Sequence, residues 1–255
     1  MSGQPHAKDP ARLTRAHVTP FAVFMGFMVV LMLVAAKIEW KHPDAPWWRQ
    51  DPAHFIYPIQ TLVTLGFLIH YWRNYTFRWS LKWSLTAIVF GAVGIGFWLL
   101  PTALYDHWGL TGKTTGILRF LGVDSRRDGF DPSIFQNPAA WWSVVVLRFL
   151  RAVVVVALVE EIFWRGFLMR FVCDWEGDYW KQPFGRGHWK SFLIVTGMFM
   201  FAHGTADFAG AIVYGSLTYL LCVWSKSLGA CVVMHATANL LMGLYILNTG
   251  KYGLW

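Results

Sequence analysis

The sequence has few charged residues, few cysteines and no internal repeat. Asp, Glu, Lys and Arg make up 14% of its 255 residues, against roughly 25% in an average soluble domain. Three widely spaced cysteines, Cys173, Cys222 and Cys231, exclude a disulfide-rich module and a zinc ribbon. Most of the rest is apolar, with 56% hydrophobic and 18% aromatic residues, which excludes an intrinsically disordered chain. The composition therefore predicts a polytopic membrane protein.

The net charge is positive but does not indicate a nucleic-acid partner. Lys and Arg number 22 and Asp and Glu number 14, which gives a formal net charge of +8. The basic residues are spread between long apolar runs, as in the cytoplasmic loops of membrane proteins, and do not form one basic segment. We therefore expect contact with a lipid bilayer and no binding to nucleic acid.

Seven stretches are apolar and long enough to cross a bilayer, which takes roughly 17–25 residues in a helix. They cover residues 16–36, 52–72, 83–105, 141–171, 191–206, 208–225 and 227–250, and charged residues interrupt the fourth. A bilayer offers no partner to an unpaired strand edge, so each stretch should be a helix. The predicted fold class is all-α, a polytopic transmembrane bundle of about seven helices.

A polar stretch rich in Gly, Asp and Pro, residues 111–138, divides the sequence. We expect a three-helix membrane region with a connecting loop over residues 1–140 and a four-helix region over 141–255. Twelve Lys and Arg residues lie on the same side as the N-terminus (before 16, in 73–82, in 165–190 and at 226), and eight lie on the other (in 37–49, in 113–127 and at 251). This excess predicts an integral membrane protein with a cytoplasmic N-terminus.

The fourth span contains ionisable residues that would be costly in lipid, which makes them candidates for a functional site. From Arg148 to Arg170 an α-helix rises about 33 Å, the thickness of a bilayer core. Within it, Glu161 and Arg165 are one turn apart and can form an ion pair. Glu160 is rotated by about 100° from Glu161 and remains available for chemistry.

Polar residues of two further spans lie at a similar depth. Measured from the predicted cytoplasmic ends at about 1.5 Å per residue, Glu160 lies about 15 Å deep and His203 about 20 Å deep. On the same scale His235 lies about 14 Å deep and Asn239 about 20 Å deep, one turn further along the same helix face. Four polar side chains from three helices should therefore converge.

Each of these residues also has a structural explanation when taken alone. A histidine in a membrane helix often packs and forms one hydrogen bond, and a Glu–Arg pair can be purely structural. A non-proteolytic membrane protein, such as an ion- or proton-coupled transporter or an immunity or scaffold protein, is therefore the alternative interpretation. The convergence of four polar groups and the absence of repeats favour an enzyme.

Three ordered motifs carry a resemblance to a known family. They are Glu-Glu-x-x-x-Arg at 160–165, Phe-x-x-x-His at 199–203 and His-x-x-x-Asn at 235–239. The chain thus resembles the CAAX protease and bacteriocin-processing (Abi, CPBP) intramembrane endopeptidases over about residues 144–247. The layout of the first 140 residues is similar to the bacterial branch found beside exosortase sorting systems. The resemblance implies a multi-pass protein of the bacterial inner membrane.

The resemblance also implies a hydrolytic mechanism and a substrate, a membrane-associated protein or peptide. Glu160 and His203 would activate a water molecule, while His235 and Asn239 would bind the oxyanion, with Glu161 and Arg165 as structural support. Carboxylate and imidazole bases and pre-aimed N–H donors suit these roles. Two His and one Glu can also hold a catalytic zinc ion, so a divalent metal at Glu160, His203 and His235 stays open, although the motif His-Glu-x-x-His is absent.

Overall fold

The computed structural model describes residues 9–37 and 51–255, and every regular element in these ranges is helical. Six of the described helices are long and apolar enough to cross a membrane, and one further apolar helix is shorter. The long ones are α1 (Pro10–Lys37), α3 (Pro52–His70), α4 (Leu81–His107), the continuous helix Pro138–Cys173, Thr205–Ser225, which contains α10 (Phe208–Ser225), and α11 (Leu228–Thr249). The predicted all-α membrane fold is confirmed. Lys8, Lys41 and Arg49, used in the charge count, lie outside the described residues.

Short elements connect these helices. They are η1 (Trp72–Asn74), α5 (Gly116–Phe120), η2 (Pro132–Ile134), η5 (Tyr179–Lys181), η6 (Thr205–Asp207) and η7 (Tyr252–Leu254).

The helix ends are set by local sequence. Before Pro52, the carboxylate of Asp51 accepts a hydrogen bond from the Ala53 N–H at 2.7 Å. Asn137 does the same for Ala139 just before Pro138. Such acceptors satisfy N–H groups that lack helical partners, and proline at the first position loses nothing because its N–H would be unpaired. At the other end of α11, Gly250 has φ of 67°, a left-handed conformation that glycine adopts without strain.

The helix Pro138–Cys173 changes its winding twice. It runs as α6 (Pro138–Phe149), a π-helical stretch η3 (Leu150–Val156), α7 (Ala157–Glu161), a second π-helical stretch η4 (Ile162–Leu168) and α8 (Met169–Cys173). A π-helix bonds each N–H to the carbonyl five residues earlier, and such stretches are frequent at functional sites. The two stretches flank the glutamate pair, and they alter which side chains share a face.

The fifth predicted span is shorter than expected. The helix α9 (Trp189–Phe201) ends before His203, and Gly204 is extended. His203 therefore lies in the turn after the helix and not within it. The turn is held in place because Asp207 accepts hydrogen bonds from Arg126 and from Trp98 Nε1.

The described residues form two compact units, Met1–Thr76 and Phe77–Trp255. In the first, α1 packs on α3, Gln60 donates to the Phe24 carbonyl at 2.8 Å, and Tyr75 donates to the Ala16 carbonyl at 2.8 Å. Burial raises the pKa of Tyr75, so its hydroxyl remains a donor. The boundary between the two units precedes α4, whereas the polar stretch at residues 111–138 predicts a division at residue 140. The predicted division by function stays a prediction.

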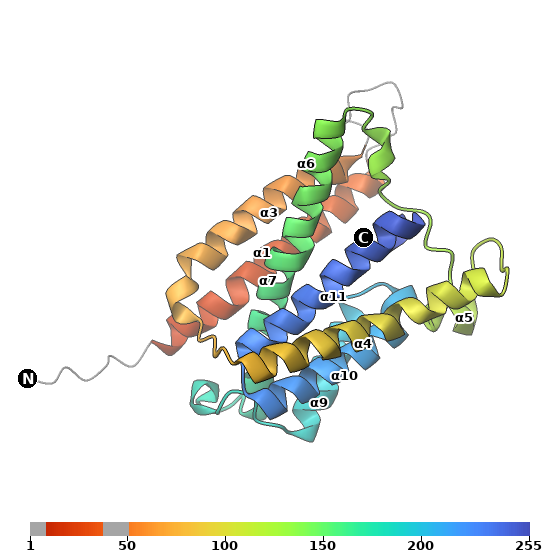
Figure 1. Cartoon of the computed structure of the whole chain (residues 1–255). Helices are drawn as coiled ribbons and strands as arrows, with labels where there is room; N and C mark the ends of the chain where they lie inside the picture. The colour runs from red at the N-terminus through yellow and green to blue at the C-terminus, as the bar shows by residue number, and fades with distance from the viewer. Residues whose placement is uncertain (1–8, 38–50) are drawn as a thin grey trace, which may run out of the picture. The chain divides into compact units, whose positions relative to one another are not determined.

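The second unit is built on close contact between α4, α10 and α11 (Figure 1). A Cβ atom at Gly91 would lie 2.6 Å from the Met234 carbonyl oxygen, and one at Gly94 would lie 2.8 Å from the Tyr214 ring. Small residues at such crossings let membrane helices approach closely, which increases van der Waals contact. This packing brings α11 and α10 against the helix that carries the glutamates.

Candidate functional site

A cavity of about 220 Å³ lies in the second unit, and the predicted site residues line it. Glu160, His203, His235 and Asn239 all contribute to its wall. The other lining residues are Ile95, Trp98, Arg151, Ala152, Val156, Phe199, Asp207, Tyr214, Ala238, Met242, Gly243, Gly253, Leu254 and Trp255. Water can thus reach polar groups inside the bundle.

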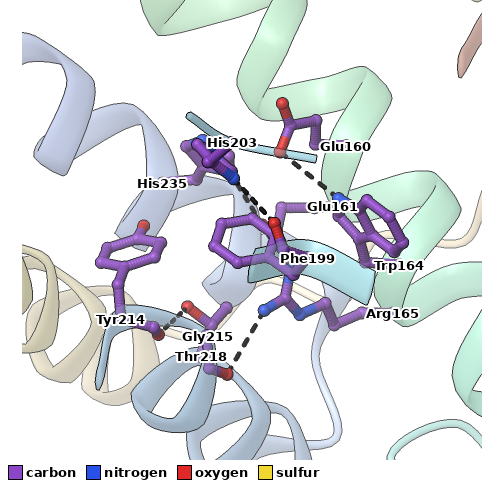
Figure 2. A network of polar contacts seen from close by, with 10 residues as sticks. All are labelled: Glu160, Glu161, Trp164, Arg165, Phe199, His203, Tyr214, Gly215, Thr218 and His235. Atoms are coloured by element: carbon purple, nitrogen blue, oxygen red, sulfur yellow. Dashed lines mark hydrogen bonds and ion pairs between the residues drawn. The ribbon is translucent and has the colours of Figure 1, made fainter. Parts of the chain in front are cut away.

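The two neighbouring glutamates have different environments. Glu160 is half-buried, and its carboxylate accepts a hydrogen bond of 3.3 Å from Trp164 Nε1 (Figure 2). Glu161 is fully buried and forms an ion pair of 3.1 Å with Arg165, which is also fully buried. Removing two charges from water is costly, and their pairing offsets part of that cost. The predicted pairing of Glu161 with Arg165 is therefore present, and Glu160 faces the cavity.

Glu161 has a second partner, which the sequence did not reveal. The Nδ1 atom of His235 lies 2.8 Å from the same carboxylate oxygen, Oε1, that binds Arg165. Because a carboxylate only accepts, His235 must donate through Nδ1–H. Glu161 therefore orients the His235 ring, in the way that a buried carboxylate positions a histidine in many enzymes.

His203 is oriented by the backbone of its own segment. Its Nδ1 atom lies 2.7 Å from the Phe199 carbonyl oxygen. A carbonyl only accepts, so Nδ1 carries the proton, and Nε2 of the neutral ring is left with a lone pair. The edge of the Trp98 ring system packs against the imidazole, with the ring centroids 5.2 Å apart. His203 thus presents a basic nitrogen in a restricted orientation.

Asn239 is tied to the helix that carries the glutamates. Its Nδ2 donates to the Ala152 carbonyl at 2.7 Å. A side-chain amide has two N–H groups, so one donor beyond this bond remains on the same nitrogen. The bond joins α11 to η3 and fixes the amide at the cavity wall.

The cavity lies toward one end of the second unit. Asp207, which follows α9, and Gly253 to Trp255, which follow α11, form part of its wall. Nearby, the buried Lys251 ammonium binds Asp106 at 2.7 Å and the Ser125 carbonyl at 3.1 Å. The segment after α11 therefore borders the cavity, and Lys251 ties the start of that segment to the end of α4 and to the connection that follows it. The loop between α8 and α9 is at the other end, because each helix traverses the bundle once.

The sequence leaves a divalent metal at Glu160, His203 and His235 as an alternative, and it stays an alternative here. Among residues 9–37 and 51–255, no group of three or more His, Cys, Asp or Glu side chains is arranged to hold a metal ion. His203 and His235 use Nδ1 for their hydrogen bonds to Phe199 and Glu161, an arrangement also found in histidines that bind a metal through the other ring nitrogen.

Some lining residues were not identified as site residues from the sequence. Trp98 and Tyr214 carry no sequence signal of a site, since aromatic residues are frequent in every span. The segment Gly253 to Trp255 has no motif. Arg151 did have a signal, a charge within an apolar run, but α-helical geometry does not place it on the same face as Glu160.

Residues 141–241 match the model of a protein family described as Rce1-like, type II CAAX prenyl endopeptidase Rce1-like. The segment is similar to this family. All three motifs lie within the matched residues, which cover less than half of the chain. No curated protein and no solved structure gives a significant match. The match supports a CAAX-type protease in general and confirms the family resemblance seen in the sequence.

Proposed function

We propose that the protein is an intramembrane endopeptidase that hydrolyses a peptide bond of a membrane-associated protein or peptide. The observation that carries this proposal is the position of Glu160, His203, His235 and Asn239 on the wall of one cavity. A carboxylate and an imidazole beside a water-sized space can act as bases, and N–H donors on the wall of the same space can bind an oxyanion. The alternative, a non-proteolytic transporter, immunity or scaffold protein, predicts no cleavage that depends on Glu160.

In the proposed reaction, Glu160 removes a proton from water while the water oxygen attacks the carbonyl carbon of the substrate. The Nε2 lone pair of His203 helps to hold and share this proton. The carbonyl oxygen becomes an oxyanion in the tetrahedral intermediate. Collapse of the intermediate breaks the C–N bond, and the proton held by Glu160 and His203 passes to the leaving nitrogen.

The oxyanion is bound by His235 and Asn239. The N–H of Asn239 that does not bond Ala152 serves as one donor. His235 serves as the other when its ring is protonated, because Nε2 then carries a hydrogen. The Glu161 carboxylate at Nδ1 fixes the orientation of this ring, so that Nε2 is held in place. Glu161 and Arg165 thereby support the site without touching the substrate.

Loss of the base tests this proposal. Glu160→Gln keeps the size of the side chain and removes the base, so cleavage should fall by about 10²- to 10⁴-fold, as is typical for general-base catalysis. Purified protein in detergent is incubated with a peptide library, and products are read by mass spectrometry. Glu176→Gln, at an exposed loop position, is the matched control and should keep full activity. A fully active Glu160→Gln enzyme, or ion flux in liposomes without cleavage, would overturn the proposal.

We further infer a glutamate-type enzyme, because no three His, Cys, Asp or Glu side chains of the described residues are grouped closely enough to hold a metal ion. Prolonged dialysis against a strong chelator should leave Glu160-dependent cleavage intact. Loss of cleavage on dialysis, with recovery on adding zinc and not magnesium, would show a metal-assisted reaction.

A further inference from the structure

Tyr214 of α10 lies on the wall of the cavity, and its ring is enclosed by other side chains. The ring centroid is 5.8 Å from that of the His235 imidazole, and the two ring planes meet at 66°. The rings of Trp98 and Phe199 each have their centroid 6.1 Å away. On α4, the absence of a side chain at Gly94 makes room for the ring, since a Cβ atom there would lie 2.8 Å from it. The ring is therefore held in one position beside His235.

The hydroxyl group of this ring has no hydrogen-bond partner, which is unusual for a buried polar group. Tyr214 is 2% exposed, and within the described part of the chain its Oη atom forms no hydrogen bond. The hydroxyl of Thr218, one turn further along α10, donates its own proton to the Tyr214 carbonyl at 2.9 Å. Figure 2 shows the Tyr214 hydroxyl at the end of the ring that points away from α10, on the side where the His235 imidazole lies.

A buried hydroxyl without a hydrogen bond costs stability, so a phenylalanine would suit this position better if packing were its only role. The polar groups around the cavity offer a reason for the hydroxyl. We propose that the Tyr214 hydroxyl donates a hydrogen bond to the oxyanion, as a third donor beside Asn239 and His235. This inference rests on the proposed peptidase function, since the oxyanion forms in the same cavity. Tyrosine is among the side chains that stabilise such an intermediate when they are held in place beforehand.

Tyr214 differs from the other two donors in what it requires. Asn239 has one N–H beyond its bond with Ala152, and His235 donates through Nε2 only when its ring is protonated. A phenol hydroxyl carries its proton throughout the neutral pH range and donates without a change in charge. Because packing fixes the ring, only rotation about the C–O bond is needed to aim the proton. The missing partner in the free protein is then supplied by the reaction itself.

Removal of this single oxygen atom tests the inference. Tyr214→Phe keeps the ring, so kcat should fall by about 10²- to 10³-fold, the range for the loss of one oxyanion donor. KM should change little, because the contact forms only in the transition state. The melting temperature in detergent should stay the same or rise, since a buried group without a partner is removed. A purely structural tyrosine would not lose activity while keeping its stability.

Tyr219→Phe is the matched control on the same helix. Tyr219 is also buried, but its hydroxyl donates to the His188 carbonyl and accepts from the His188 N–H, each at 3.0 Å. It does not line the cavity. The substitution removes both bonds, so this variant should melt earlier than the wild type and keep full activity while folded. The two variants should thus show opposite effects on stability and activity.

A tetrahedral analogue tests the oxyanion contact without turnover. The library peptide that is cleaved best is synthesised with a phosphonate in place of the scissile amide, so that an anionic oxygen replaces the oxyanion. Tyr214→Phe should weaken the binding of this phosphonate by about the same factor as it lowers kcat, because transition-state analogues depend on the same contacts. The uncleaved amide peptide should bind equally well to Glu160→Gln protein with and without the Tyr214→Phe substitution.

Unchanged kcat in Tyr214→Phe protein, or equal binding of the phosphonate with and without the hydroxyl, would overturn the inference. Cleavage that depends on Glu160 and not on Tyr214 would refute the role of the hydroxyl and leave the peptidase function standing. The absence of cleavage by the wild-type protein would instead refute the peptidase function, and this inference with it.

Discussion

At the scale of single residues, two adjacent glutamates in one helix have different surroundings. Glu160 contacts Trp164 and the cavity, whereas Glu161 is enclosed by Arg165 and His235. The difference comes from helix geometry, because a rotation of about 100° separates a wall position from a core position. Substitution of Glu160 should therefore lower mainly the activity, and substitution of Glu161 should lower mainly the stability of the protein.

Glu161→Gln should destabilise the protein. Loss of its charge strands Arg165 in a fully buried position, and breaking one partner of a buried pair costs about 3–5 kcal/mol. The amide oxygen can still accept from His235, so the loss reports mainly on the charge. Thermal unfolding of the purified protein in detergent should show a clearly lowered melting temperature, whereas Glu160→Gln should melt near the wild type.

A second substitution gives the control for this prediction. Arg165→Met removes the stranded charge, so the double variant of Glu161→Gln with Arg165→Met should recover much of the lost stability. The same second substitution should not restore activity to Glu160→Gln. Recovery of activity there would mean that the base and the structural carboxylate are assigned to the wrong glutamates.

At the scale of helices, the close crossing of α4 and α11 holds His235 and Asn239 in place. The crossing depends on the absence of a side chain at Gly91, where α4 meets the backbone of α11. Membrane helices gain stability from such close approach, and a rigid backbone carbonyl cannot give way as a flexible side chain can. The site is thus sensitive to changes in α4, which has no motif residue.

Gly91→Ala should therefore destabilise the protein and lower activity. The added Cβ would lie 2.6 Å from the Met234 carbonyl oxygen, so the helices must separate. Gly96→Ala is the matched control on the same helix, since a Cβ there meets nothing within 4 Å. Alanine is a better helix former than glycine by roughly 1 kcal/mol, so Gly96→Ala should melt at the same temperature or slightly higher. Equal melting of the two variants would show that the crossing tolerates a wider spacing.

At the scale of the whole molecule, successive helices cross the membrane in opposite directions, and this topology determines the side to which the cavity opens. The loop between α8 and α9 is on the side where Lys and Arg are in excess, which we expect to be the cytoplasm. The cavity is bordered by Asp207 and by Gly253 to Trp255 at the other end of the bundle. In this topology it opens away from the cytoplasm.

Cysteine labelling in whole cells checks this topology. In a variant with Cys173, Cys222 and Cys231 replaced by Ser, a cysteine at exposed Thr111 should react with a membrane-impermeant maleimide added outside. A cysteine at exposed Glu176 should react only after the cells are opened. Labelling of both positions from one side would contradict the alternation of the helices, and the reversed pattern would contradict the predicted orientation.

The sequence by itself determined the seven apolar helices, because length and hydropathy suffice where every backbone group must be bonded within its own helix. It also determined the pairing of Glu161 with Arg165, since residues four apart share a face of one helix. Both predictions use only local geometry. The spacing of apolar and charged residues along the sequence is therefore enough to predict both.

Only the tertiary structure decided the contacts between helices and the departures from α-helical winding. The bond from His235 to Glu161 joins residues 74 positions apart, and no spacing rule predicts it. The turn that places His203 beyond α9 depends on Arg126 and Trp98, which lie far away in the sequence. The place of Arg151 depends on the π-helical stretch, which packing stabilises and residue type alone does not specify.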